Sequence, residues 1–225
     1  MLKKVRSEQM LTEEQEDYLK AIFGLNGTTD YVSNKNLAQD LNIKPSSVSE
    51  MMLRLKKEDY VDIRPYKGVK LTQKGLNHTA NIIKRHRLIE RFLIEELEYT
   101  WDQVHEEAEI LEHRVSEHFI EKIDKLMDYP KTCPHGGIIP RENQIEEIYN
   151  TPLSTFEVGD KIKIKRVMDY VNLLDYLSNE ELLIGDIVEI TKKDELNQLI
   201  ELSLNGKTIM ISETNASYIF GTKEG

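Results

Sequence analysis

The spacing of apolar residues changes near Thr151-Pro152, and this change constrains the fold more than any other feature of the 225-residue sequence. Before that point, apolar residues recur mainly at helical intervals. After it, Lys161-Ile162-Lys163-Ile164-Lys165 alternates strictly, as a half-buried strand does. We therefore expect an α+β protein in which a largely helical region precedes a small β domain.

The β domain carries a hairpin pattern. Ile187–Ile190 predicts a strand after Gly185-Asp186. Leu199–Leu204 and Thr208–Ile211 predict two further strands, joined by Asn205-Gly206, which favours a tight two-residue turn. We expect this tail to be barrel-like.

Charge is distributed unevenly along the chain. The net charge is −10, but residues 1–75 carry 13 Lys/Arg and 11 Asp/Glu, which gives +2. Residues 76–150 and 151–225 have net charges of −7 and −5. An acidic body attached to a mildly basic head can still bind DNA through the head.

Composition excludes several classes of protein. No run of about 18 apolar residues exists that could span a membrane. Cys133 is the only cysteine, so the chain has no intramolecular disulfide and no thiolate-rich zinc site. We therefore expect a cytoplasmic protein without a membrane partner.

The head has the pattern of a helix-turn-helix. Ser33 is placed to cap a short helix from Asn34 to Leu41. Asn42-Ile43-Lys44 then predicts a turn, and Pro45 suits the first position of a second helix. The core face of that second helix would carry Val48, Met52 and Leu55.

Two short strands follow the second helix and would form a wing around the basic turn Pro65-Tyr66-Lys67-Gly68. Small hydroxyl and basic side chains on the outer face of the helix can approach phosphates and base edges, and wing cations can contact the DNA backbone. We predict a winged helix-turn-helix that binds double-stranded DNA. The expected contacts are Lys44, Ser46, Ser47, Ser49, Glu50 and Arg54 on the helix, with Arg64 and Lys67 on the wing.

A His/Glu face distinguishes the helix predicted from residue 102 onward. At about 100° per residue, four side chains fall within about 100° of arc: His105, Glu109, Glu112 and His113. A separate stripe would face the core and comprise Val104, Ala108, Leu111, Val115 and Phe119. Imidazoles and carboxylates at these spacings can hold a divalent ion, although an acid-rich helix face is often only solvated.

Two metal sites are more plausible than one. His105 and His113 are eight residues apart, about 12 Å along a helix axis, which is too far for one ion. An earlier helix offers His86 and Glu90, one turn apart on one face.

Short motifs occur along the whole chain: Glu16-Asp17-Tyr18-Leu19, Pro45-Ser46-Ser47-Val48-Ser49, Tyr66-Lys67-Gly68, Arg85-His86-Arg87-Leu88-Ile89-Glu90, Val104-His105-Glu106-Glu107-Ala108-Glu109 with Glu112-His113, and Cys133-Pro134-His135-Gly136. Together they resemble the diphtheria-toxin-repressor family of metal-dependent regulators, and most of all its manganese-sensing branch. The resemblance runs from Met10 nearly to the end. It implies a winged helix-turn-helix over 1–72 (with 1–9 as a variable extension), a helical metal-binding and dimerisation domain over 73–149, and an SH3-like β domain over 150–225.

The resemblance also implies two ligand sets. The primary set would be Asp17, Glu109, Glu112 and His113. The ancillary set would be His86, Glu90 and His105, completed from the tail by Asp169 or, as the alternative, Asp175.

Two positions bear on how far the family pattern extends. Lys20 stands where short members of the manganese branch have a second acid, so their closely paired two-metal site is not expected. The family uses the Cys133-Pro134-His135-Gly136 segment structurally, so we do not expect ligands there.

By resemblance, the protein is a manganese-responsive, homodimeric repressor of metal-uptake genes. The iron-sensing branch has a methionine in place of Asp17 and a cysteine in place of Glu109, and hard carboxylates suit manganese better than soft sulfur does. Iron(II) is the main alternative ion and zinc the third. An ion that ties Asp17 in the head to the body would hold the two recognition helices of a dimer at the separation of successive major grooves.

Two other functions compete with this interpretation. A winged-helix sensor of a small non-metal ligand would not need the His/Glu face. A metallohydrolase would need an open metal position, a general base and a substrate cleft, and the sequence has no His-Glu-x-x-His motif. We therefore expect a regulator and not an enzyme.

Overall fold

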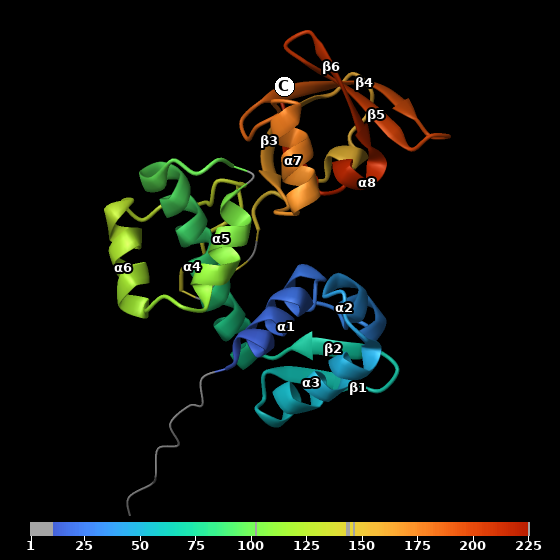
Figure 1. The fold of residues 1–225 in the computed structure, drawn as a ribbon. Helices are drawn as coiled ribbons and strands as arrows, with labels where there is room; N and C mark the ends of the chain where they lie inside the picture. Colours follow the sequence, from blue (N-terminus) through green and yellow to red (C-terminus); the bar gives the residue numbers. More distant parts are fainter. Residues whose placement is uncertain (1–10, 102, 143–144, 146, 225) are drawn as a thin grey trace, which may run out of the picture. The chain divides into compact units, whose positions relative to one another are not determined.

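The computed structural model divides the chain into two compact units, Met1–Ile83 and Lys84–Gly225 (Figure 1). It describes residues 11–101, 103–142, 145 and 147–224. The variable extension predicted over 1–9 lies outside the described residues. Each unit has an apolar core of its own.

Three helices and a two-stranded wing occur in the first unit. The helices are α1 (Glu13–Gly24), α2 (Asn34–Asp40) and α3 (Pro45–Lys57), and the wing pairs β1 (Val61–Arg64) with β2 (Gly68–Leu71) in antiparallel fashion. Two predicted helix signals are confirmed. The Ser33 side chain caps α2 by accepting a hydrogen bond from the backbone N–H of Asn36, and Pro45 is the first residue of α3.

Apolar side chains from these elements fill the core of the first unit. The predicted core face of α3 is confirmed, because Val48, Met52 and Leu55 are at most 2% exposed. The wing is joined to the segment before α2 by a bridge in which Val32 and Val69 exchange backbone hydrogen bonds of 2.8 and 2.9 Å. The wing therefore has a fixed base.

Three helices follow the wing, and two of them lie entirely in the second unit. α4 (Gln73–Leu97) begins among the residues of the first unit and ends in the second, followed by α5 (Val104–Glu112) and α6 (Glu117–Leu126). The core stripe predicted from Val104 to Phe119 is wrong at its end. α5 stops at Glu112, and the Ser116 side chain caps α6 by accepting from the Phe119 N–H. Phe119 belongs to α6 and is 38% exposed.

The tail is the small antiparallel sheet expected of an SH3-like domain (Figure 1). Its strands have the order β6-β5-β4-β3-β7, and the hairpin at Asn205-Gly206 is confirmed. The described pairings form an open sheet instead of a closed barrel. The bounds are η1 (Leu153–Thr155), β3 (Lys161–Val167), α7 (Val171–Asn179), β4 (Ile187–Asp194), β5 (Leu199–Leu204), β6 (Lys207–Ser212), α8 (Glu213–Ala216) and β7 (Ile219–Lys223).

Candidate metal centre and nucleic-acid interface

Two charged side chains one turn apart on α4 are withdrawn from solvent. His86 is 3% exposed and Glu90 is fully buried, and the two are in contact, with His86 Nε2 lying 3.1 Å from Glu90 Oε1. Residues four apart lie on one face of a helix, so the α-helical spacing alone brings this pair together. Buried ionisable groups are rare unless they are paired or coordinate a metal.

The other nitrogen of His86 faces α5. His86 Nδ1 lies 2.6 Å from Glu112 Oε2 and 3.6 Å from Glu109 Oε1. Glu112 is fully buried, and its other oxygen lies 3.3 Å from Nε2 of His113. The prediction assigned His86 to the ancillary set alone. In the structure its two ring nitrogens contact both sets, Glu90 on one side and Glu109 and Glu112 on the other.

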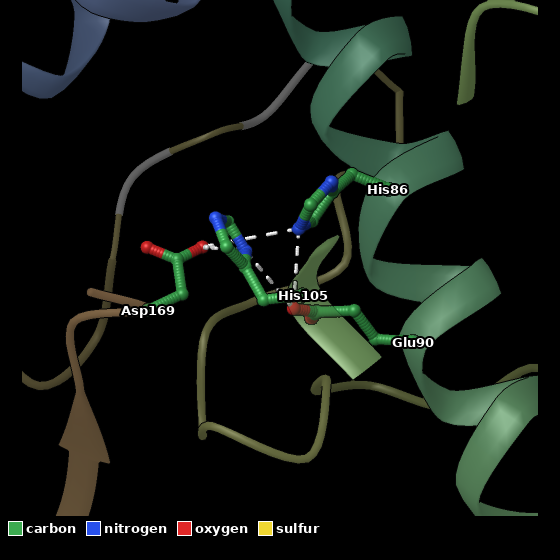
Figure 2. Close-up of side chains that lie close together, drawn as sticks. All are labelled: His86, Glu90, His105 and Asp169. Carbon is green, nitrogen blue, oxygen red and sulfur yellow. Dashed lines mark hydrogen bonds and ion pairs between the residues drawn. The ribbon is translucent and has the colours of Figure 1, made fainter. Parts of the chain in front are cut away.

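An aspartate from the tail completes a group of four donors in the second unit (Figure 2). Asp169, which follows β3, has Oδ2 3.8 Å from Nδ1 of His105 and 4.0 Å from Nε2 of His86. One ligand atom from each of His86, Glu90, His105 and Asp169 lies within 4.8 Å of the others. Asp175, the alternative, is exposed on α7.

Neighbouring charges keep these acids ionised. Burial would raise the pKa of Glu90, but His86 and His135 outweigh burial and hold that pKa well below its usual value. Burial would likewise raise the pKa of Asp169, yet the charge of His105 contributes to a net lowering. Both carboxylates are therefore available as anionic ligands at neutral pH.

A second group of possible ligands surrounds Glu90, and it includes two side chains from the segment where no ligands were expected. Cys133 and His135 are buried, at 5% and 2% exposure, and His135 Nδ1 lies 3.2 Å from Glu90 Oε1. Donor atoms of Glu90, Cys133 and His135 lie within 4.8 Å of one another. The short Cys-x-His spacing was the available signal, but no local pattern relates it to Glu90, 43 residues earlier.

The same segment also has the expected structural role. The backbone N–H of Val167 in β3 donates to the carbonyl of His135 at 2.9 Å. Gly136 has a φ of +82°, and a Cβ there would lie 2.0 Å from the carbonyl oxygen of Lys165. This close approach joins the segment to the tail, immediately before Asp169.

The donor chemistry of both groups fits a divalent cation. Two buried ligand atoms have no hydrogen-bond partner among the described residues: Glu90 Oε2 and His105 Nδ1. A buried polar atom without a partner costs about 1–3 kcal/mol. Imidazole nitrogen and carboxylate oxygen are common ligands of transition metals, so an ion would satisfy the atoms that the protein leaves unpaired.

Asp17, the remaining residue of the predicted primary set, lies on α1 of the first unit and is half-buried. Its neighbour Glu16 is anchored within the same unit, where Glu16 Oε1 lies 3.0 Å from Nε2 of His78 on α4. Lys20 lies one turn after Asp17 on the same helix, as the sequence requires.

The predicted DNA contacts are all solvent-exposed: Lys44, Ser46, Ser47, Ser49, Glu50, Arg54, Arg64 and Lys67. Four of them have local partners, and one of these is Arg64, whose Nε lies 3.6 Å from Asp62 Oδ2. Ser49 Oγ donates to the Pro45 carbonyl at 3.1 Å and accepts from Asn34 Nδ2 at 3.0 Å. Arg54 pairs with Glu50 one turn earlier, at 2.5 Å. Ser49 therefore ties α3 to α2, whereas Ser46 and Ser47 stand at the exposed start of α3.

Comparison with known families covers most of the chain. Residues 10–69 match the N-terminal DNA-binding domain of iron-dependent repressors. Residues 72–141 match the metal-binding and dimerisation domain of the same family, and residues 151–223 match the FeoA domain.

Individual relatives agree with these matches. The transcriptional regulator MntR of Oceanobacillus iheyensis is 34% identical over 54% of this chain and 82% of its own length. MntR of Bacillus subtilis is 32% identical over 53% of this chain and 84% of its own. The solved structure of the manganese regulator SloR is 38% identical, with a TM-score of 0.83 over 95% of this chain and all of that one. ScaR with bound Zn²⁺ is also 38% identical, with a TM-score of 0.84 over 93% and 99%.

The chain belongs to the diphtheria-toxin-repressor family, in the branch that contains these manganese regulators. It is a metal-dependent transcriptional repressor that binds operator DNA as a homodimer, and it is not an enzyme. None of the described helices is long and apolar enough to cross a membrane.

The candidate donors of this repressor come from all three matched segments. Asp17 lies within the DNA-binding match, and Asp169 within the FeoA match. The donors on α4 and α5, with Cys133 and His135, lie within the metal-binding and dimerisation match.

Proposed function

We propose that the repressor is activated by manganese(II) and controls genes for metal uptake. Its predicted ligand sets offer carboxylate oxygen and imidazole nitrogen, which suit a hard divalent ion. The similarity to regulators named for manganese supports this choice. Action on operator DNA implies a cytoplasmic location.

The observation that carries the proposal is the group of four possible ligands in the second unit, of which His86 and Glu90 are buried. Glu90 and His105 each hold a buried ligand atom without a hydrogen-bond partner in the described structure, beside His86 and Asp169. We assign this group as the ancillary site. Glu109, Glu112 and His113, joined by Asp17 from the head, would form the primary site, as the family resemblance implies.

The proposed switch follows from which residues carry the ligands. Asp17 belongs to the DNA-binding head, whereas Glu109 and Glu112 belong to the body. Carboxylates that share a site repel one another, and a bound divalent cation supplies the positive charge that offsets this repulsion. The ion would then favour one conformation of the repressor, with ligands from head and body on the same metal. If DNA binds that conformation best, metal and DNA each increase the affinity for the other.

The group formed by Glu90, Cys133 and His135 favours zinc as a competing ion. It includes a thiol, and soft sulfur ligands select zinc over manganese. Glu90 is common to this group and to the ancillary set, so the two groups would compete for it. Cys133→Ser should weaken zinc binding much more than manganese binding.

A binding titration tests the proposal. Operator affinity of the full chain would be measured with manganese(II), anaerobic iron(II), zinc(II) and a chelator. We expect manganese to raise the affinity at the concentrations at which it binds the protein, and the chelator to reverse the effect. Stronger activation by iron(II) than by manganese would contradict the metal assignment, and metal-independent binding would contradict the switch.

The division into domains at residues 1–72, 73–149 and 150–225 stays a prediction. The structure gives only the two compact units, which meet within α4. Limited proteolysis near residue 150 would test whether the tail is a separate domain.

A further inference from the structure

Tyr66 stands at the tip of the wing with its side chain in solvent. Its relative exposure is 108%, the highest among the exposed large hydrophobic side chains of the described residues. It lies in the turn between Arg64 and Gly68, the last residue pair of the β1–β2 ladder. An aromatic ring left in water forgoes the free energy that its burial would provide. The folding of the head therefore gains nothing from this ring.

The backbone of Tyr66 is also strained. Its φ is +63°, in the left-handed region that bulky side chains rarely adopt and that glycine adopts freely. A glycine at the tip would relieve this strain, and the chain already uses one two residues later, at Gly68. Strain retained at a specific position points to a function for the residue that bears it.

The base of the wing holds this tip in place. A Cβ on Gly68, whose φ is +116°, would lie 2.0 Å from the carbonyl oxygen of Val32, so the strand is pressed against the segment before α2. On the other strand, the Arg64 guanidinium lies 4.8 Å from the ring centre of Tyr31 and its Nε lies 3.6 Å from Asp62. Tyr66 is therefore presented from an anchored hairpin.

The charges beside Tyr66 indicate what it meets. Arg64 and Lys67 are exposed cations on either side of Tyr66 in the sequence, and cations on a wing pair with the phosphates that border a DNA groove. The minor groove is only about 6 Å wide and admits narrow protein elements, often with an apolar or aromatic side chain that contacts the base pairs.

We propose that Tyr66 enters the minor groove of the operator and reads the width and base-pair edges of that groove. The inference rests on the DNA interface proposed above and adds to it a residue that carries no charge. Lys67 and Arg64 would supply affinity for any DNA, and Tyr66 would supply preference for A·T pairs beneath the wing, because the guanine 2-amino group obstructs the floor of the groove at G·C pairs.

The test uses the full chain saturated with manganese(II) and a duplex that the wild-type protein selects from a random-sequence pool. Tyr66→Ala should weaken binding about tenfold, which is within the range of one stacked or wedged aromatic. It should not change the salt dependence, because no charge is removed. Tyr66→Phe should bind within about twofold of wild type, since the ring is retained. An unchanged affinity in Tyr66→Ala would overturn the proposal.

Base substitution beneath the wing identifies the groove. Replacing A·T by G·C should weaken wild-type binding, and replacing it by inosine·cytosine should restore binding, because inosine lacks the 2-amino group. Tyr66→Ala should bind the three duplexes alike. If inosine·cytosine does not restore wild-type binding, Tyr66 does not read the minor groove. Failure of the wild type to select any duplex would instead count against the DNA-binding function itself.

A glycine variant excludes a purely structural role. Tyr66→Gly relieves the positive φ, so we expect a higher melting temperature together with the weakened DNA binding of the alanine variant. A melting temperature of Tyr66→Ala well below that of the wild type would show that the ring supports the fold of the wing and would contradict the proposal.

Discussion

The head and the body of this repressor bury different kinds of side chain. The first unit encloses an apolar cluster, and among its described residues the buried polar side chains are Glu16 and Thr79. The second unit buries six polar or charged side chains among the described residues: His86, Glu90, Glu112, Asp124, His135 and Arg166. The predicted DNA contacts of the head are exposed, whereas several candidate metal ligands of the body are buried.

This difference means that the head and the body should depend on metal to different degrees for their stability. An apolar core stabilises the head without any ligand. Buried ionisable groups in the body lose their contacts with water, and only hydrogen bonds or opposite charges can compensate for that loss. Several buried polar atoms there have no hydrogen-bond partner among the described residues. Metal should therefore alter the body and leave the intrinsic stability of the head almost unchanged.

The largest effect should come from a buried acid of the body. Glu112→Ala removes a fully buried carboxylate that contacts both His86 and His113. We expect metal-stimulated operator binding to fall about 100-fold, with the fold and the dimer retained. Fluorescence anisotropy during a manganese titration measures this. Glu106→Ala, an exposed acid on the same helix, is the matched control, and an equal loss in both variants would remove the distinction between interior and surface.

A smaller effect should follow from changing the one proposed ligand that the head provides. Asp17→Met replaces a hard oxygen by a soft sulfur, so the preference should move from manganese towards iron(II) by roughly tenfold, or about 1.4 kcal/mol. Operator binding with each metal under anaerobic conditions gives the ranking. If the ranking does not change, ligand softness at this position does not decide the metal.

The tail should contribute less than either of these residues. Asp169→Ala removes the tail donor that lies near His86 and His105, and we expect manganese activation to weaken about fivefold. Asp175→Ala, on the exposed face of α7, should behave as wild type. Isothermal titration of both variants measures the affinities, and a larger loss in the Asp175 variant would reverse the assignment.

The smallest loss of DNA affinity, and the one least dependent on DNA sequence, is expected when a surface lysine of the head is removed. Lys67→Ala should lower the slope of log affinity against log salt by about one for each wing and weaken all DNA sequences alike. Lys122→Ala, an exposed lysine on α6, serves as the control. A loss confined to one sequence would place Lys67 among the residues that read bases.

Local patterns predicted the parts of the fold that depend on local physics. The Ser33 cap, Pro45 at the start of α3 and the turn at Asn205-Gly206 follow from the backbone preferences of single residues. The break between α5 and α6 was missed, although Ser116 is a helix-capping residue, because the apolar period continues by chance to Phe119. The short helix α7, between two strands, was also missed.

The candidate centre was predictable only where its residues share a helix. His86 with Glu90, and Glu109 with Glu112, are set by helical spacing. The approach of Cys133 and His135 to Glu90 depends on how a loop packs against α4, which no periodicity encodes. The position of His86 between the two donor sets likewise depends on the packing of α4 against α5.

We propose that manganese occupies the group of His86, Glu90, His105 and Asp169 in the body and a second set shared with the head. A crystal structure of the manganese-saturated protein, with anomalous scattering recorded at the manganese edge, tests it most directly. We expect one anomalous peak among His86, Glu90, His105 and Asp169, and another among Asp17, Glu109, Glu112 and His113. Peaks confined to exposed acidic residues, with the buried donors still unliganded, would contradict the account.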